Sequence, residues 1–105
     1  MEKNDFIVQI LQLFLGEVPP LVVKLQIKFK EKKWKEVQAI AHKLRSNFAA
    51  VGANRPSRCC ALIEENAGDI KKRKSLHSLM NQLNTSSPCV ETELKRALGR
   101  LHSTA

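Results

Sequence analysis

The fold is decided by Ile40-Ala-His-Lys-Leu-Arg-Ser-Asn-Phe-Ala-Ala-Val-Gly52, a stretch near the middle of the 105-residue chain. Apolar residues recur through this stretch, and just before it, at the three- and four-residue spacing of one helix face. The predicted buried stripe consists of Val37, Ile40, Ala41, Leu44, Phe48 and Val51. At about 100° per residue, His42 lies roughly 140° from the centre of that stripe, so we expect its imidazole to face solvent.

The outer face of this predicted helix carries unusually small side chains. An ordinary solvated helix face holds Glu, Lys and Gln. The positions that share the face with His42 are instead Ala39, Ser46, Ala49, Ala50 and Ala53. A bare face with one protruding imidazole indicates a surface on which another protein docks.

The N-terminal third of the sequence predicts two helices. The first covers Phe6–Leu15 and is expected to close at Gly16. The second is expected to begin at Pro19 and Pro20, because a proline loses no hydrogen bond in the first turn of a helix. It ends in the polar run 30–33.

The remaining two thirds predict three more helical segments. The central helix runs from about Trp34 to about Gly52 or Asn54, and the next one has Pro56 in its first turn and stops at Gly68. In the last segment, residues 84–88 resemble a loop in composition. The apolar register continues in phase across them, which favours one long helix over residues 76–101, kinked or briefly broken near Pro88.

These elements predict an all-α protein that forms one domain over residues 1–105. No strand-type alternation, internal repeat or low-complexity tract is present in the sequence. Helices joined by short connections pack antiparallel, so an up-and-down bundle is the expected architecture.

No motif for a self-sufficient catalyst, a metal or a cofactor is found in the sequence. The four glycines are scattered singly, so there is no phosphate-binding loop, and no HExxH motif or Cys/His set has zinc spacing. The three cysteines, Cys59, Cys60 and Cys89, contain no CxxC pair, and we interpret them as reduced core residues. We therefore expect neither a cofactor nor a metal.

The apolar run Phe6–Leu15 contains Gln9 and Gln12 and is too short for a membrane span. It also lacks the basic flank and cleavage site of a signal peptide. We therefore expect no membrane insertion and a cytoplasmic location.

His42 is the only candidate nucleophile on a prepared surface. A neutral imidazole is nucleophilic near physiological pH, because the reference pKa of histidine is about 6.5. Attack on a phosphoryl group also needs positive charge for the moving oxygens. Lys43 and Arg45 are close enough in the helix to supply that charge, and Ser46 is small enough to let a partner close over the ring.

The stretch also resembles a known family. Ala41-His-Lys-Leu-Arg-Ser46 followed by Ala49-Ala-Val-Gly-Ala53 is similar to the signature of histidine-containing phosphotransfer (HPt) domains. That signature has a basic residue three positions after the histidine, a small one at four and a glycine at ten, places filled here by Arg45, Ser46 and Gly52. Cys60-Ala-Leu-Ile-Glu64 resembles the family's "C-x-x-L-E" continuation. The family favours Lys and Gly where this chain has Arg45 and Ser46.

The resemblance implies a reaction and a set of partners. His42 would accept a phosphoryl group from a receiver-domain aspartate and pass it to another receiver, as a phosphohistidine carrier and not as an enzyme. Arg45 would stabilise the phosphoryl oxygens, with Lys43 nearby, and Glu64 would hydrogen-bond the other ring nitrogen. The family's surface for docking would include Ser46, Ala49 and Gly52. The implied fold is a four-helix bundle with an additional N-terminal helix, and the implied partners are response-regulator receiver domains and a hybrid sensor histidine kinase.

The charge of the chain keeps an alternative open. The formal net charge is +8 and the isoelectric point near 9.8, which suits an acidic receiver surface but also nucleic acid. A basic helical module that binds nucleic acid or an acidic protein without phosphotransfer would use the basic runs 28–35 and 71–74. Aromatic stacking residues are nearly absent from both runs, which argues against nucleic acid. A domain that docks on receivers without transferring phosphate is a third reading.

Around His42, we expect six cations to steer docking on an acidic partner. These are Lys28, Lys35, Lys43, Arg45, Arg55 and Arg58.

Overall fold

The structure, a computed structural model, describes residues 3–103 of the chain and the side chains of residues 5–101. Within that part the chain is helical and contains no strand, so the predicted all-α class is confirmed. Four α-helices are joined by short connections, and one 3-10 segment, η1, precedes the last of them. The elements are α1 (Lys3–Lys30), α2 (Trp34–Ala50), α3 (Asn54–Ala67), η1 (Ile70–Ser75) and α4 (Leu76–Ser103).

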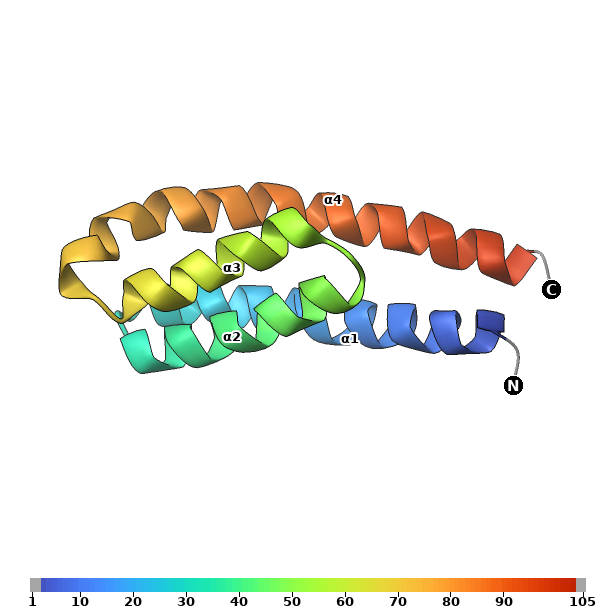
Figure 1. Cartoon of the computed structure of the whole chain (residues 1–105), viewed down its shortest axis with the longest axis horizontal. Coiled ribbons are helices and arrows are strands. Elements are labelled where there is room, and N and C mark those ends of the chain that lie inside the picture. Colours follow the sequence, from blue (N-terminus) through green and yellow to red (C-terminus); the bar gives the residue numbers. More distant parts are fainter. Residues whose placement is uncertain (1–2, 104–105) are drawn as a thin grey trace.

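The four helices form an antiparallel up-and-down bundle, in which successive helices run in opposite directions (Figure 1). Each helix packs against the next in the chain, and α4 closes the bundle by packing against α1. The long helices α1 and α4 extend together beyond the shorter α2 and α3, so the start of α1 and the end of α4 lie at the same extended end (Figure 1). The molecule is therefore elongated, measuring 52 × 23 × 20 Å.

The predicted break between two N-terminal helices is wrong, because α1 continues through Gly16, Pro19 and Pro20. An interior proline costs a helix about 3 kcal/mol. The compensation comes from an apolar stripe that stays in phase across the prolines and is buried in the core; its members are Leu11, Phe14, Val18, Val22 and Leu25. Burying one such side chain contributes about 1.5–3 kcal/mol, so tertiary packing outweighs the local cost. The described residues consequently contain no separate N-terminal helix.

The predicted continuity of the C-terminal helix is confirmed, since α4 passes through Pro88 without interruption. The loop-like composition of residues 84–88 is accommodated inside the helix. Ser87 is buried and its hydroxyl donates to Glu91 Oε1 at 3.3 Å. The Thr85 and Thr92 hydroxyls donate to backbone carbonyls one turn earlier, at 3.0 and 2.9 Å. Hydrogen bonds of this kind let hydroxyl residues lie within a helix.

The core contains the stripe predicted for α2, except that Val51 is only partly buried. Phe48 is fully buried and meets the Phe14 ring edge-on, with 5.5 Å between the ring centroids. Cys59 and Cys60 are also in the core, and burial raises the pKa of the Cys60 thiol to about 12. Cys89 is exposed on α4, so its prediction as a core residue is wrong.

Helix α2 ends in a turn that depends on Gly52. This residue has a φ of +75°, a left-handed conformation that favours glycine. The amide of Ala53 donates to the Phe48 carbonyl at 2.9 Å, and the amide of Gly52 to that of Ala49 at 3.0 Å. These are the two hydrogen bonds of a Schellman motif. The turn aims the chain directly into α3, beside α2.

Helix α1 also meets the length and composition of a membrane-spanning segment. Residues Asp5–Lys30 include an 18-residue window with a mean hydropathy of 1.8, of which 22% is buried within the structure. The expectation of no insertion rested on an apolar run that stopped at Leu15, and the unbroken helix removes that length argument. The core helix of a soluble protein passes the same test, and α1 supplies five buried residues to the core.

Candidate functional site

His42 lies on the outer face of α2, as its helical phase predicted. Its side chain is 65% exposed, whereas the preceding Ala41 is fully buried in the core. The adjacent buried residues hold α2 firmly, so the imidazole projects from a rigid element near the middle of the bundle. An exposed ring on a rigid helix is open to a reaction partner without prior unfolding of any segment.

The carboxylate of Glu64 lies against the inner edge of the ring. It approaches His42 Nδ1 at 3.0 Å through Oε2 and 3.2 Å through Oε1. The two residues are 22 positions apart in sequence, and the contact exists because α2 and α3 pack side by side. An ionised carboxylate only accepts hydrogen bonds, so Nδ1 carries the hydrogen and donates it. The lone pair of a neutral ring is then at Nε2.

Arg45 joins this pair and Lys43 does not. The Arg45 guanidinium lies 3.9 Å from Glu64 Oε1, and its side chain is 53% exposed. Its backbone is held from the other side, because Ser57 Oγ donates to the Arg45 carbonyl at 3.0 Å. Lys43 is exposed and makes no contact with either His42 or Glu64 in the part of the chain that is described. Among the described residues, the positive charge paired with Glu64 beside the ring therefore comes from Arg45.

The small residues predicted around His42 are at the surface. Ala39, Ser46, Ala49 and Ala50 are all exposed along the outer face of α2, and Ala53 is half-buried. Gly52, predicted as part of the docking face, has a structural task as well, because its left-handed backbone ends the helix. The ring consequently stands on a flat, low surface with few side chains to obstruct a partner.

Gln38 belongs to this site, and the sequence reasoning missed it. It lies one turn before His42 on α2, and its amide Nε2 donates to the backbone carbonyl of Glu64 at 3.1 Å. With Ala39, His42 and Glu64 it lines a shallow depression beside the ring. The sequence could have indicated Gln38 as a neighbour of His42, because residues four positions apart share one face of a helix. The hydrogen bond fixes α3 against α2 where Glu64 must be held.

The basic runs are partly neutralised by contacts within the molecule. Arg73 stacks over the Trp34 ring at 4.6 Å from its centroid, and Lys72 pairs with Glu65 at 3.1 Å. Lys28 lies 3.5 Å from Glu31 and is only 19% exposed. Among residues 3–103, no group of three or more His, Cys, Asp or Glu residues gathers as a metal site would require. Some cations of both basic runs are therefore already paired within the molecule, whereas Lys35 lies about two turns before His42 on the same face of α2.

A comparison with known protein families identifies the family of this chain. The family model of the Hpt domain matches residues 9–104, which is most of the chain. Hpt domains serve phosphotransfer in two-component signalling, as phosphohistidine carriers whose partners are response-regulator receiver domains. No curated protein and no solved structure gave a significant match.

Proposed function

The chain belongs to the Hpt domain family, and on that premise we propose that residues 1–105 form one phosphotransfer domain with His42 as the phosphorylated residue. The observation that carries the proposal is the contact between His42 Nδ1 and Glu64, at 3.0 Å, on an otherwise bare helix face. This contact occupies Nδ1, so Nε2 of the 65% exposed side chain is the nitrogen that we propose a phosphorylated aspartate reaches.

The proposed transfer begins with a receiver domain that carries an aspartyl phosphate. The lone pair of His42 Nε2 attacks the phosphorus, the bond from phosphorus to the aspartate oxygen breaks, and its electron pair stays on the carboxylate. The phosphorylated ring keeps its hydrogen at Nδ1, donated to Glu64. The positive charge that develops on the ring is stabilised by that carboxylate. The reverse reaction delivers the group to a second receiver.

Arg45 is proposed to bind the phosphoryl oxygens, because its guanidinium lies beside the ring and is half exposed. A guanidinium remains charged and offers paired N–H donors, which suits phosphate oxygens. Lys43 adds charge from the adjacent position. Ser46, Ala49 and Gly52 are proposed to leave room for the receiver, whose active site is acidic and complements the net charge of +8.

We place this function in the cytoplasm, as an intermediate between two receivers, one of which can belong to a hybrid sensor histidine kinase. The alternative, a basic module that binds nucleic acid or an acidic protein without phosphotransfer, has less support. Arg73 and Lys72 of the second basic run are already paired with Trp34 and Glu65.

The deciding experiment measures transfer of labelled phosphate. A panel of receiver domains is phosphorylated with a radiolabelled acyl phosphate and mixed with the wild-type chain, His42→Gln and His77→Gln. His77 is a matched control, an exposed histidine of α4 whose ring meets Phe29 and not a carboxylate. We expect acid-labile label on the wild type and on His77→Gln only. Label on His42→Gln would refute the assignment.

A further inference from the structure

A groove of the molecule is separate from the His42 site. It lies between α3 and α4 and has a volume of about 830 Å³, within the range of small-molecule sites. Arg55 of its α3 wall is nine residues before Glu64, which at 100° per residue places it about 180° around the helix. The groove therefore opens on the side of α3 that faces away from the phosphotransfer residues. The expectation that Arg55 and Arg58 would steer a partner toward His42 does not fit this placement.

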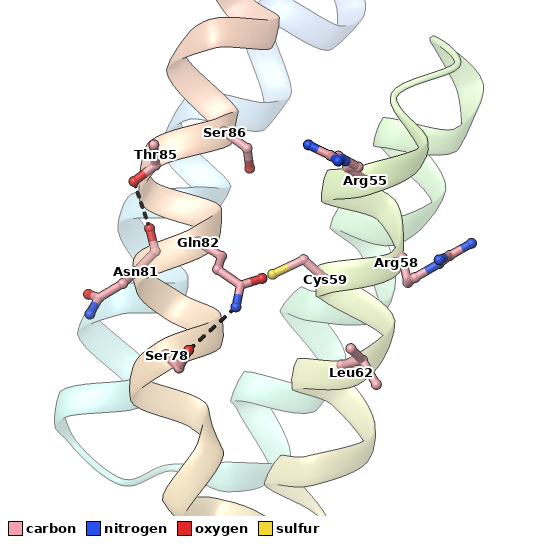
Figure 2. Close-up of a pocket in the computed structure, with 9 residues that line it drawn as sticks. All are labelled: Arg55, Arg58, Cys59, Leu62, Ser78, Asn81, Gln82, Thr85 and Ser86. Carbon is pink, nitrogen blue, oxygen red and sulfur yellow. Dashed lines mark hydrogen bonds between the residues drawn. The ribbon is translucent and has the colours of Figure 1, made fainter.

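The α4 wall presents a row of uncharged hydrogen-bonding side chains. Its members recur at three- and four-residue spacing on one face of the helix and are Ser78, Asn81, Gln82, Thr85 and Ser86. At 1.5 Å per residue, the row extends for about 12 Å. Figure 2 shows Gln82 and Ser86 on the side of α4 that faces α3, with the Cys59 thiol between the two helices, whereas the Asn81 amide is directed away from α3. That length suits a small molecule and not an extended polymer.

The α3 wall supplies positive charge with no compensating acid. Arg55 and Arg58 line the groove, no carboxylate does, and neither arginine has an ion-pair partner within residues 3–103. In Figure 2 the Arg55 guanidinium is directed toward the groove, near Ser86, whereas Arg58 is directed away from it. Arg55 is thus the residue placed to contact a bound anion.

The start of α3 adds to this positive field. Its N-cap residue, Ala53, makes no side-chain cap, and its first turn contains no acidic residue. Helix N-termini carry a partial positive charge and favour an anion or an acidic side chain. In this first turn the Asn54 amide already donates to the Gly52 carbonyl and Pro56 has no N–H, so the positive charge here is mainly that of the Arg55 side chain, which has no counter-charge. A bound phosphate would supply it.

From the groove, its charge and its polar row, we propose that the α3–α4 groove binds a small organic phosphate. The phosphate is bound by the Arg55 guanidinium, near Ser86. The remaining polar groups of the ligand hydrogen-bond to Gln82, and its apolar part rests on Leu62. Arginine forks are well matched to phosphate oxygens, and amide side chains recognise the polar edges of a base or sugar. This site does not depend on phosphotransfer by His42.

The test uses adenosine monophosphate, ribose 5-phosphate, inorganic phosphate and adenosine as probes, followed by amide chemical shifts of the full chain. We expect saturable shifts at Arg55 and Ser86 with the two organic phosphates. Arg55→Gln should weaken their binding about tenfold to a hundredfold, the usual result of losing a charged hydrogen bond. Lys35→Gln is the control, since it removes the same charge from an exposed residue of α2 outside the groove. His42→Gln should retain full binding.

Several outcomes would overturn the proposal. One is the absence of saturation with either organic phosphate up to about 10 mM, a concentration that corresponds to about −2.7 kcal/mol. A second is an equal loss of organic-phosphate affinity in Arg55→Gln and Lys35→Gln, which would mean that the phosphate is attracted by net charge alone. A third is a set of amide chemical-shift changes centred on Arg45 in place of Arg55. Binding of adenosine as tight as that of its monophosphate would show that the phosphate is not recognised. Inorganic phosphate that binds as tightly as both organic phosphates would remove the role of the α4 row.

Discussion

Replacing Glu64 with glutamine tests the proposed chemistry most directly. The substitution keeps the size of the side chain and one acceptor oxygen at 3.0 Å from His42 Nδ1, but removes the charge. A hydrogen bond to a charged group contributes about 1.5–3 kcal/mol and a neutral one about 0.5–1.5 kcal/mol, so the charge itself is worth roughly 1 kcal/mol. The His42 side chain is 65% exposed. Water therefore screens the His42–Glu64 pair, so we take the low end of this energy difference.

A loss of about 1 kcal/mol in the transition state corresponds to about a fivefold slower reaction. We expect Glu64→Gln to accept phosphate from a labelled receiver about fivefold more slowly than the wild type. The reason is that the ring becomes positive as Nε2 bonds to phosphorus, and the carboxylate stabilises that charge. The loss is far smaller than that of His42→Gln, which removes the nucleophile.

In this variant the Arg45 guanidinium also loses its partner, the Glu64 carboxylate 3.9 Å away. A second measurement therefore distinguishes the effect on the His42 ring from the effect on Arg45. Nitrogen NMR of His42 reports the fraction of neutral ring that carries its hydrogen at Nδ1. We expect this fraction to fall in Glu64→Gln, because a carboxylate holds the Nδ1 hydrogen and an amide can also donate. Arg45 has no direct influence on that ratio.

Glu65→Gln is the matched control. It makes the same change one residue away, on an exposed carboxylate whose partner is Lys72 at 3.1 Å. We expect wild-type transfer and an unchanged tautomer fraction. The reasoning is refuted if Glu64→Gln leaves both the rate and the tautomer fraction of the wild type intact, or if Glu65→Gln slows transfer equally.

Further predictions concern stability and partners. Gly52→Ala should lower the free energy of unfolding by about 1–2 kcal/mol, because its φ of +75° strains an alanine; Gly16→Ala, inside α1 with open space around it, should raise that free energy by about 0.5–1 kcal/mol. The midpoints of urea unfolding test both predictions, and an equal change in the free energy of unfolding in the two variants would contradict the prediction for Gly52→Ala. The pKa of the Cys60 thiol rises from 9.0 to about 12 on folding, so the folded state holds its proton longer and stability should fall as pH rises through that interval, by up to about 1.4 kcal/mol per unit. The alkaline decline should be shallower in Cys60→Ala, and an identical slope would count against it. Duplex DNA at 0.15 M salt should not bind more tightly than about 1 µM, the ordinary non-specific limit; a salt-resistant submicromolar gel shift would instead favour the alternative function.

Local periodicity was sufficient for the central helix and for α4. The apolar spacing around His42 correctly predicted which side of α2 is buried, because every residue of a helix has a fixed angle to its neighbours. The same periodicity correctly predicted that the helix of α4 continues through Pro88. It failed at Gly16, Pro19 and Pro20, where the composition resembles a helix end but the helix continues. Propensity is a local property, and the buried stripe that outweighs it requires three other helices.

The sequence by itself determined that the chain is helical, that His42 projects from a bare face, and that the signature around it is that of a phosphotransfer family. Only the tertiary structure decided which groups surround the ring. Glu64 reaches Nδ1, and Gln38 fixes the Glu64 backbone, because α2 and α3 pack at one particular register. Packing of α4 against α3 likewise supplies the second wall of the groove that Arg55 lines. Contacts between helices depend on relative position and rotation, which no single helix encodes.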